Sequence, residues 1–191
     1  MKFLILLFFL CLGCTSSDTT NSSKGENMKE ETIKVLKSKE GIQIIHQNFA
    51  AACFNKTWEF IEKKELSEED KEDMIATSYA SLWHWKKRKD CTQENLSIAY
   101  WQLGRVHCLA GKAEIAREFG EKCLKVSKDL SPFCKGYAYE VLCNAAVVSK
   151  DMRTAKKYLK LAQEQLEKIT DKQNKSYLQK DLEKLLSRIN Q

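Results

Sequence analysis

The chain has 191 residues, of which 30% are charged, with 32 lysine and arginine residues against 26 acidic residues and a formal net charge of +6. This length fits one domain with a substantial core, and the mixing of charges of both signs along the chain argues against a nucleic-acid surface. Seven glycines and one proline are too few for the many turns of a β-sheet protein. The composition therefore predicts an all-α fold.

The first fourteen residues are typical of an export signal. Lys2 precedes an apolar run from Phe3 to Leu12, and Gly13 and Cys14 follow it. Ten apolar residues in a helix reach about 15 Å, half of a bilayer core, so a permanent membrane span is not expected. The segment resembles a bacterial lipoprotein signal, which implies removal of residues 1–13 and lipidation of Cys14. The alternatives are a plain signal peptide cut nearby and a short buried apolar helix.

The segment after Cys14 is polar and contains no large apolar side chain, TSSDTTNSSKGEN. Such a composition buries too little surface to offset the entropy of ordering it, so we expect residues 14–27 to form a flexible tether. Thr15 stands where an aspartate commonly retains a lipoprotein in the inner membrane. The resemblance therefore implies a lipid anchor in the bacterial cell envelope, in the outer membrane and facing the periplasm.

Residues 28–191 follow a helical period and form the predicted helical domain. We expect seven to eight helices. Their approximate ranges are 28–36, 42–64, 68–87, 93–110, 113–127, 133–149, 152–169 and a last helix that follows Asp171. Ser67 and Asp171 are expected to cap the helices that follow them. The basic run from Lys86 to Cys91 is interpreted as a solvated helix end, where cations oppose the negative end of the helix dipole.

Apolar stripes predict which helix faces pack inward. The stripe of residues 42–64 is Ile42, Ile45, Phe49, Cys53 and Phe60. The stripe of residues 68–87 is Ile75, Tyr79, Leu82 and either Trp83 or Trp85. The last helix carries Tyr177, Leu178, Leu182, Leu185, Leu186 and Ile189 on one side and charged residues on the other, as expected for the terminal helix of a stack.

Residues 100–123 alternate bulky and small side chains over two helices separated at Gly111. The residues that carry this pattern are Tyr100, Leu103, Gly104, His107, Ala116, Phe119 and Cys123. They resemble the tetratricopeptide repeat, whose signature is W-x2-L-G-x2-Y followed by A-x3-F. A second unit carries Tyr139, Leu142, Cys143, Ala146, Ala155, Leu159 and Ala162. The resemblance covers about residues 96–165 and implies antiparallel helix pairs stacked as a short right-handed superhelix, with residues 42–87 as a divergent pair.

A second resemblance is to bacterial repeat proteins that carry an Asn-x-Thr-Trp helix, here Asn55 to Trp58, and an Ala-Ser-x-x-His-Trp helix, here Ala80 to Trp85. This resemblance implies no activity.

The tetratricopeptide resemblance also implies a binding groove, because the first helix of each pair lines a concave surface that holds extended peptides. The residues on that face are Ile98, Trp101, Arg105, Tyr137, Glu140 and Asn144. Tryptophan, tyrosine and arginine are the side chains that most often anchor interfaces. We therefore expect a protein or peptide partner, with Trp101 and Arg105 at the site. The alternative is that these residues pack within the chain, against the last helix or the amino-terminal pair.

Enzyme chemistry has no motif in this sequence. The G-x-S-x-G elbow, the phosphate-binding loop and the dinucleotide fingerprint are absent, so no catalytic residue and no cofactor are assigned. His46 with Cys53, and His84 with Cys91, have a spacing that shares a helix face, but neither pair reaches the three ligands of a metal site. The alternative function is a small-molecule-binding protein or enzyme that uses Trp58, His84, Trp85 and Trp101.

Six cysteines follow residue 14, and an even number in an exported protein permits a disulfide framework. The helices already supply a core, however, and disulfide dependence belongs mainly to domains too small to have one. Several of these cysteines also occupy positions of small packing residues. We therefore expect mostly free thiols.

Overall fold

The computed structural model describes residues 22–191, and the side chains from Met28 onward. Within this range the fold is all-α, with eight helices and no strand, which confirms the predicted class. The helices are α1 (Ser22–Lys37), α2 (Lys39–Ile61), α3 (Glu68–Lys87), α4 (Gln93–Leu109), α5 (Ala113–Val126), α6 (Pro132–Val148), α7 (Met152–Leu166) and α8 (Lys172–Ile189). No helix in the described range is long and apolar enough to span a bilayer. The predicted signal, Cys14 and most of the tether lie outside the described residues, and α1 begins at Ser22, inside the segment predicted to be a tether.

Local sequence accounts for the helix boundaries. The Ser67 hydroxyl accepts from the Asp70 N–H at 3.0 Å while the Asp70 carboxylate accepts from the Ser67 N–H, so the predicted cap is a full capping box. Asp171 caps α8 in the predicted manner by accepting from Asn174 N–H at 2.8 Å. Gly111, at φ +73°, supplies the left-handed turn between α4 and α5. These polar end groups satisfy backbone donors that have no partner within their helix.

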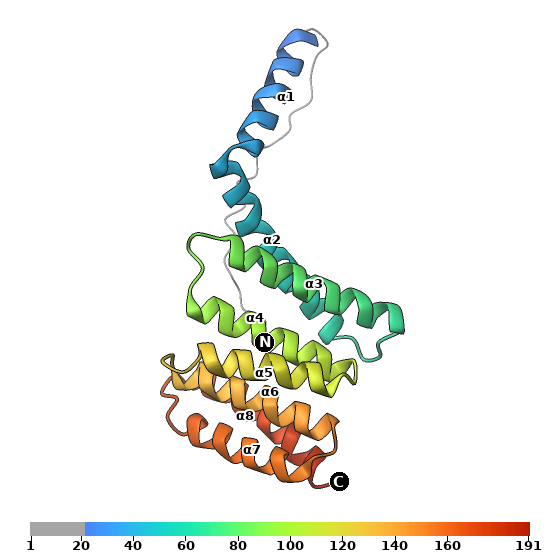
Figure 1. Cartoon of the computed structure of the whole chain (residues 1–191), viewed down its shortest axis with the longest axis vertical. Helices are drawn as coiled ribbons and strands as arrows, with labels where there is room; N and C mark the ends of the chain where they lie inside the picture. Colours follow the sequence, from blue (N-terminus) through green and yellow to red (C-terminus); the bar gives the residue numbers. More distant parts are fainter. Residues whose placement is uncertain (1–21) are drawn as a thin grey trace.

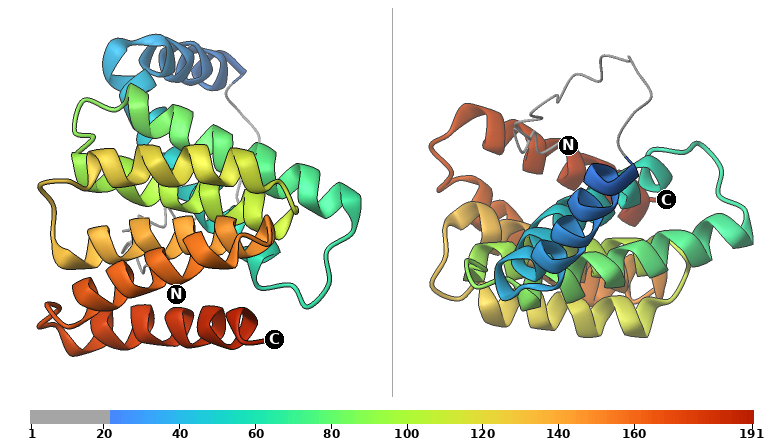
Figure 2. Two further views of the ribbon diagram at one scale, coloured as in Figure 1. Left: turned by 60° about the horizontal axis from the view of Figure 1, so that its bottom comes forward. Right: turned by 90° about the horizontal axis from the view of Figure 1, so that it is seen from above.

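The helices stack in chain order, from α1 at one end to α7 and α8 at the other (Figure 1). The most extensive contacts join α2 with α3, α4 with α5 and α6 with α7. Helix α8 packs on both α6 and α7 (Figure 2). A Cβ on Gly104 would overlap a methyl group of Val141 and press on the Ala116 carbonyl oxygen, so glycine permits the close approach of α4 to α5 and α6.

The inward face of α2 differs from the predicted one. Ile42 and Phe49 are 42% and 51% exposed, and only Phe60 of the predicted stripe is buried. The residues that pack inward are instead His46, Ala50, Ala51, Phe54, Thr57 and Trp58. The prediction was wrong because α2 is apolar around most of its circumference, and periodicity alone does not say which of two apolar faces packs inward.

In α3 the predicted face is partly correct. Leu82 and Trp85 are buried, whereas Trp83 is 52% exposed and Tyr79 is also exposed. Small polar side chains take the inward positions, since Ser81 donates to the Ala50 carbonyl oxygen of α2 at 2.9 Å. Serine lets the two helices approach closely while its hydroxyl keeps a hydrogen-bond partner. The aromatic rings are thereby displaced to the surface.

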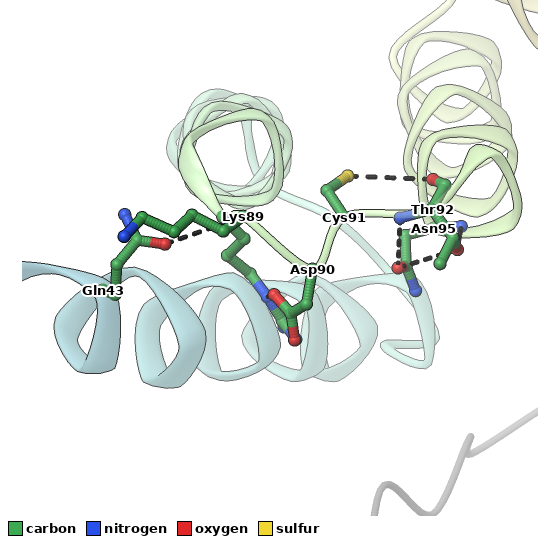
Figure 3. Close-up of polar contacts among 7 residues, drawn as sticks. Gln43, Lys89, Asp90, Cys91, Thr92 and Asn95 are labelled. Carbon is green, nitrogen blue, oxygen red and sulfur yellow. Dashed lines mark hydrogen bonds and ion pairs between the residues drawn. The ribbon is translucent and has the colours of Figure 1, made fainter. Parts of the chain in front are cut away.

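The basic segment after α3 is tied to its neighbours. The Gln43 amide of α2 accepts from the Lys89 N–H at 3.0 Å, and Thr92 and Asn95 form the cap of α4 (Figure 3). Arg88 pairs with Asp90 at 2.7 Å and lies 4.0 Å from the centroid of the Trp85 ring. Part of the run interpreted as a solvated helix end is therefore engaged within the chain.

Candidate functional site

Four of the six residues predicted to line a partner groove come together and lie against other parts of the chain, namely Trp101, Arg105, Tyr137 and Glu140. They belong to α4 and α6, and Trp58 of α2 and Asp181 of α8 complete the cluster. The other two lie at its margin, where Ile98 packs on the core and Asn144 accepts from Arg188. Trp101 and Glu140 are only 3% and 2% exposed. The Trp101 ring lies 5.9 Å from the Trp58 ring and 5.1 Å from the Tyr137 ring. Partner binding by these residues stays a prediction, and it would require α8 to move.

The polar atoms of this cluster form one network. Trp101 Nε1–H donates to Glu140 Oε2 at 2.8 Å. Arg105 Nη1 lies 3.8 Å from Glu140 Oε1 and 3.4 Å from Asp181 Oδ2. The Tyr137 hydroxyl donates to the same Asp181 oxygen at 3.4 Å. One guanidinium therefore joins two carboxylates from two helices, and at the edge of the cluster Arg188 donates to Asn144 at 2.8 Å.

The pKa values in the network follow from burial and charge. Burial raises the pKa of Glu140 to about 7, because Arg105 only partly compensates the loss of water. Burial would lower the pKa of Arg105, but the carboxylates Glu140 and Asp181 outweigh that effect and raise it. The guanidinium thus stays charged. The pKa of Tyr137 is raised, first by burial and then by Asp181.

This network fastens α8 to α4 and α6. A carboxyl group with a pKa near 7 could serve as an acid or base, yet Glu140 is covered by its own neighbours and faces no substrate space. Asp181 was not predicted from the sequence. Its signal is positional, because it lies one turn from Leu178 and Leu185 on the apolar side of α8, where a charged side chain needs a partner.

The four residues of the alternative function are divided between separate places. Trp58 and Trp101 belong to the core around α6 and α8, and Trp85 belongs to the core around α3 and α4. His84 lies at the surface side of α3, where its ring stacks on Phe49 at 5.3 Å. The structure therefore gives no common pocket to this set.

Histidines and cysteines show no metal constellation in the described range, where no group of three or more ligating side chains occurs. His46 Nδ1 and His84 Nδ1 lie 2.9 Å apart, which bridges α2 and α3 by a hydrogen bond. Burial and the nearby His46 lower the pKa of His84. The six described cysteines are all free thiols, as expected.

A groove that the sequence reasoning missed lies between α3 and α5, over α4. Its volume is about 320 Å³, and its walls are mainly aromatic. The lining residues are Tyr79, Leu82, Trp83, Lys86, Tyr100, Phe119 and Lys122. The Phe119 ring forms part of the floor, where it lies 5.7 Å from the Tyr79 ring and 6.3 Å from the Tyr100 ring. We call this feature the aromatic groove.

Two lysines give the aromatic groove its charge. Lys86 Nζ lies 5.5 Å from the centroid of the Tyr100 ring, and Lys122 Nζ lies 4.6 Å from that of Phe119. Both cations therefore stand over the rings that a bound segment would touch. The sequence offered a signal, since Tyr79, Trp83 and Lys86 recur at spacings of four and three and share one face of α3.

Comparisons of the chain with protein-family models, with curated proteins and with solved structures find no match.

Proposed function

We propose that this protein is an adaptor of the cell envelope that binds an extended segment of a partner protein in the aromatic groove. The observation that carries the proposal is the exposure of Tyr79 and Trp83 at a groove floored by two further rings. Large aromatic side chains normally lie in the core, and their grouping at a concave surface is typical of a binding site.

The size and lining of the groove favour a short segment with apolar side chains. A volume of about 320 Å³ is at the lower end of ligand pockets, which suits two or three side chains of a peptide better than a large cofactor. The rings supply flat apolar area at a small cost in conformational entropy. The groove is open to solvent between α3 and α5, so a bound chain need not end inside it.

The charge of the groove selects an acidic segment. Lys86 and Lys122 are its charged residues, and both are cations. A segment that alternates aromatic or aliphatic residues with aspartate or glutamate would place its apolar side chains on the rings and its carboxylates beside the ammonium groups. A basic segment would meet two like charges and would be rejected.

The test is site-specific photocrosslinking in the native cell. A benzoylphenylalanine in place of Trp83 should give a discrete adduct with one partner, and the same group in place of Leu109, an exposed residue at the end of α4, should not. Lys122→Glu should lower the adduct yield at least tenfold, since reversing a charge about 4 Å from a carboxylate changes the binding energy by roughly 2 kcal/mol even in water, and about 1.4 kcal/mol is a factor of ten. Lys180→Glu on α8 is the matched control. Equal adducts at both positions, or no effect of Lys122→Glu, would refute the proposal.

The envelope location belongs to the same proposal and rests on residues 1–14, with Cys14 as the lipidated residue. A lipid anchor would hold the groove near the membrane surface, where an adaptor meets membrane-bound partners. Metabolic labelling with palmitate should label the wild-type chain and leave Cys14→Ser unlabelled. If the wild-type chain stays unlabelled, the lipid anchor is refuted and the proposal is reduced to partner binding in the aromatic groove.

A further inference from the structure

The outer side of α2 carries a second apolar stripe that the described helices leave largely open, since only His84 of α3 lies against Phe49, which is still 51% exposed. The stripe consists of Ile42, Ile45, Phe49 and Cys53, at spacings of three, four and four residues. Ile42 and Phe49 are exposed, and Ile45 and Cys53 are half-buried. Such spacing marks one continuous face of a helix, and it is the spacing with which helices pack against other helices.

The helix that carries this stripe is unusually poor in charge. From Gly41 to Asn55 there are fifteen residues without Asp, Glu, Lys or Arg, the longest such stretch in the described range, in a chain with 30% charged residues. The exposed polar residues on this part of α2, among them Gln47, Asn48 and Asn55, are amides. A surface without charge is depleted in the same way as the core of a protein interface.

The neighbouring helix α1 supports the same view. Among the described helices it contacts only α2 (Figure 1), and its Ile33, Val35 and Leu36 are exposed. A helix of 16 residues with few tertiary contacts is marginal in water. Both α1 and the outer stripe therefore present apolar surface at the same end of the molecule.

We propose that the outer stripe of α2 is the interface of a homodimer, with α2 of a second copy packed on α2 of the first. A second copy fits because the stripe is uncharged: a surface with charge of one sign would repel its own copy in a two-fold arrangement, and this surface does not. The aromatic groove, with its two lysines, is the opposite case and selects a partner of opposite charge. The proposal does not depend on the function of that groove.

The available area agrees with a small dimer. Half-exposed branched and aromatic side chains contribute roughly 80–100 Å² each, so Ile42 and Phe49 together with Ile33, Val35 and Leu36 of α1 offer roughly 400 Å² of apolar surface per copy. A small stable dimer buries about 600 Å² per subunit, of which about 60% is apolar. The half-buried Ile45 and Cys53 and the polar side chains of α1 supply the remainder.

A membrane surface is the less suitable occupant. Helices that lie in a bilayer interface carry lysine and arginine beside their apolar face, whereas the segment from Gly41 to Asn55 has none. Its amides would also lose hydrogen-bonding water without gaining an ionic contact to lipid.

The experiment uses full-length chains with two different affinity tags, co-expressed and purified in mild detergent. The wild-type copies should copurify, and mass photometry should show a dimer. Ile42→Glu and Phe49→Glu should reduce copurification at least tenfold, because each buries two carboxylates in the two-fold interface. Leu109→Glu is the matched control, since Leu109 is as exposed as Ile42, at 42%, and it should leave the dimer intact. Circular dichroism should show the same helix content in all variants.

Three results would overturn the proposal. One is a monomeric wild-type chain at micromolar concentration. Another is that copurification falls equally with Leu109→Glu and with Ile42→Glu, which would indicate non-specific association. The third is that the Cys14→Ser chain forms no dimer but floats with vesicles of phosphatidylethanolamine and phosphatidylglycerol, and that Ile42→Glu abolishes this flotation, which would assign the stripe to a membrane surface instead.

Discussion

The two halves of this molecule handle their side chains in opposite ways. From α4 to α8, even charged groups are buried, and Arg105, Glu140 and Asp181 satisfy one another in the interior. In α2 and α3, large apolar groups such as Phe49 and Trp83 stay at the surface. Burial of paired charges is typical of a region whose contacts are complete within the chain, and exposure of rings is typical of a region whose contacts are completed by something else.

This contrast separates a structural surface from a proposed binding surface. The repeat pattern draws attention to the faces of α4 and α6, because a superhelix of repeats uses them for peptides. In this chain α8 and Trp58 lie on those faces, and the network holds them there. The exposed rings of Phe49, Tyr79 and Trp83 lie on the divergent pair, whereas the first repeat unit supplies Tyr100, Phe119 and Lys122 to the aromatic groove. The proposed binding surface therefore spans the junction between the divergent pair and the first repeat unit.

The largest expected effect is the loss of Arg105. Arg105→Met should lower the free energy of unfolding by about 3–5 kcal/mol at pH 8, because it leaves the buried Glu140 carboxylate without its cation. The pKa of Glu140, about 7, lies above the value of 4.5 for a free side chain, so its contribution to stability is present below pH 4.5 and is lost as pH rises through 7. Without Arg105 the stability lost as Glu140 ionises should be larger. The destabilisation by Arg105→Met should therefore be smaller at pH 5 than at pH 8.

Urea unfolding at both pH values, followed by circular dichroism, measures the Arg105 effect. The double variant Arg105→Met with Glu140→Gln is the control, since the neutral amide can still accept from Trp101, and the remaining carboxylate, Asp181, keeps Tyr137 and Lys184 as partners. It should recover a substantial part of the stability and lose most of the pH dependence. A penalty below 1 kcal/mol at pH 8 would mean that the network does not hold α8 in place, and the contrast between the two halves would fail.

The sequence was sufficient for the parts of the fold that depend on local chemistry. Capping groups such as Ser67 and Asp171 act on backbone atoms a few residues away, so the helix boundaries could be predicted from them. His107 takes the tyrosine place of the repeat signature, and its ring stacks on Phe119 with an interplanar angle of 2°.

The sites depend on contacts between helices far apart in the chain, and the sequence alone predicts such contacts poorly. Nothing near Trp101 in the sequence indicates that Trp58, 43 positions earlier by residue number, covers its ring. The outer stripe of α2 was recognised as a stripe, but its direction was wrong, because the small residues Ala50 and Ala51 form a second face that fits closer to α3 and α4. A choice between two apolar faces is decided by the shape of the neighbours, which the sequence of one helix does not contain.

The smallest expected effect is that of Ile42→Ala, and it is best measured beside the larger effect of a truncation in the other half, Leu178→Ala. Leu178→Ala, at a side chain that is 0% exposed, should lower the free energy of unfolding by about 2–5 kcal/mol through the lost contacts and the cavity left beside Gly136. Ile42→Ala, at a half-exposed side chain, should lower it by less than about 1 kcal/mol in dilute protein. Because dimer formation adds stability by mass action, the Ile42→Ala penalty should grow with protein concentration, whereas the Leu178→Ala penalty should not. Thermal unfolding at two concentrations a hundredfold apart measures both.

Equal penalties in dilute protein would show that the outer stripe is packed within the chain, and a concentration-independent Ile42→Ala penalty would argue against a second copy on that face.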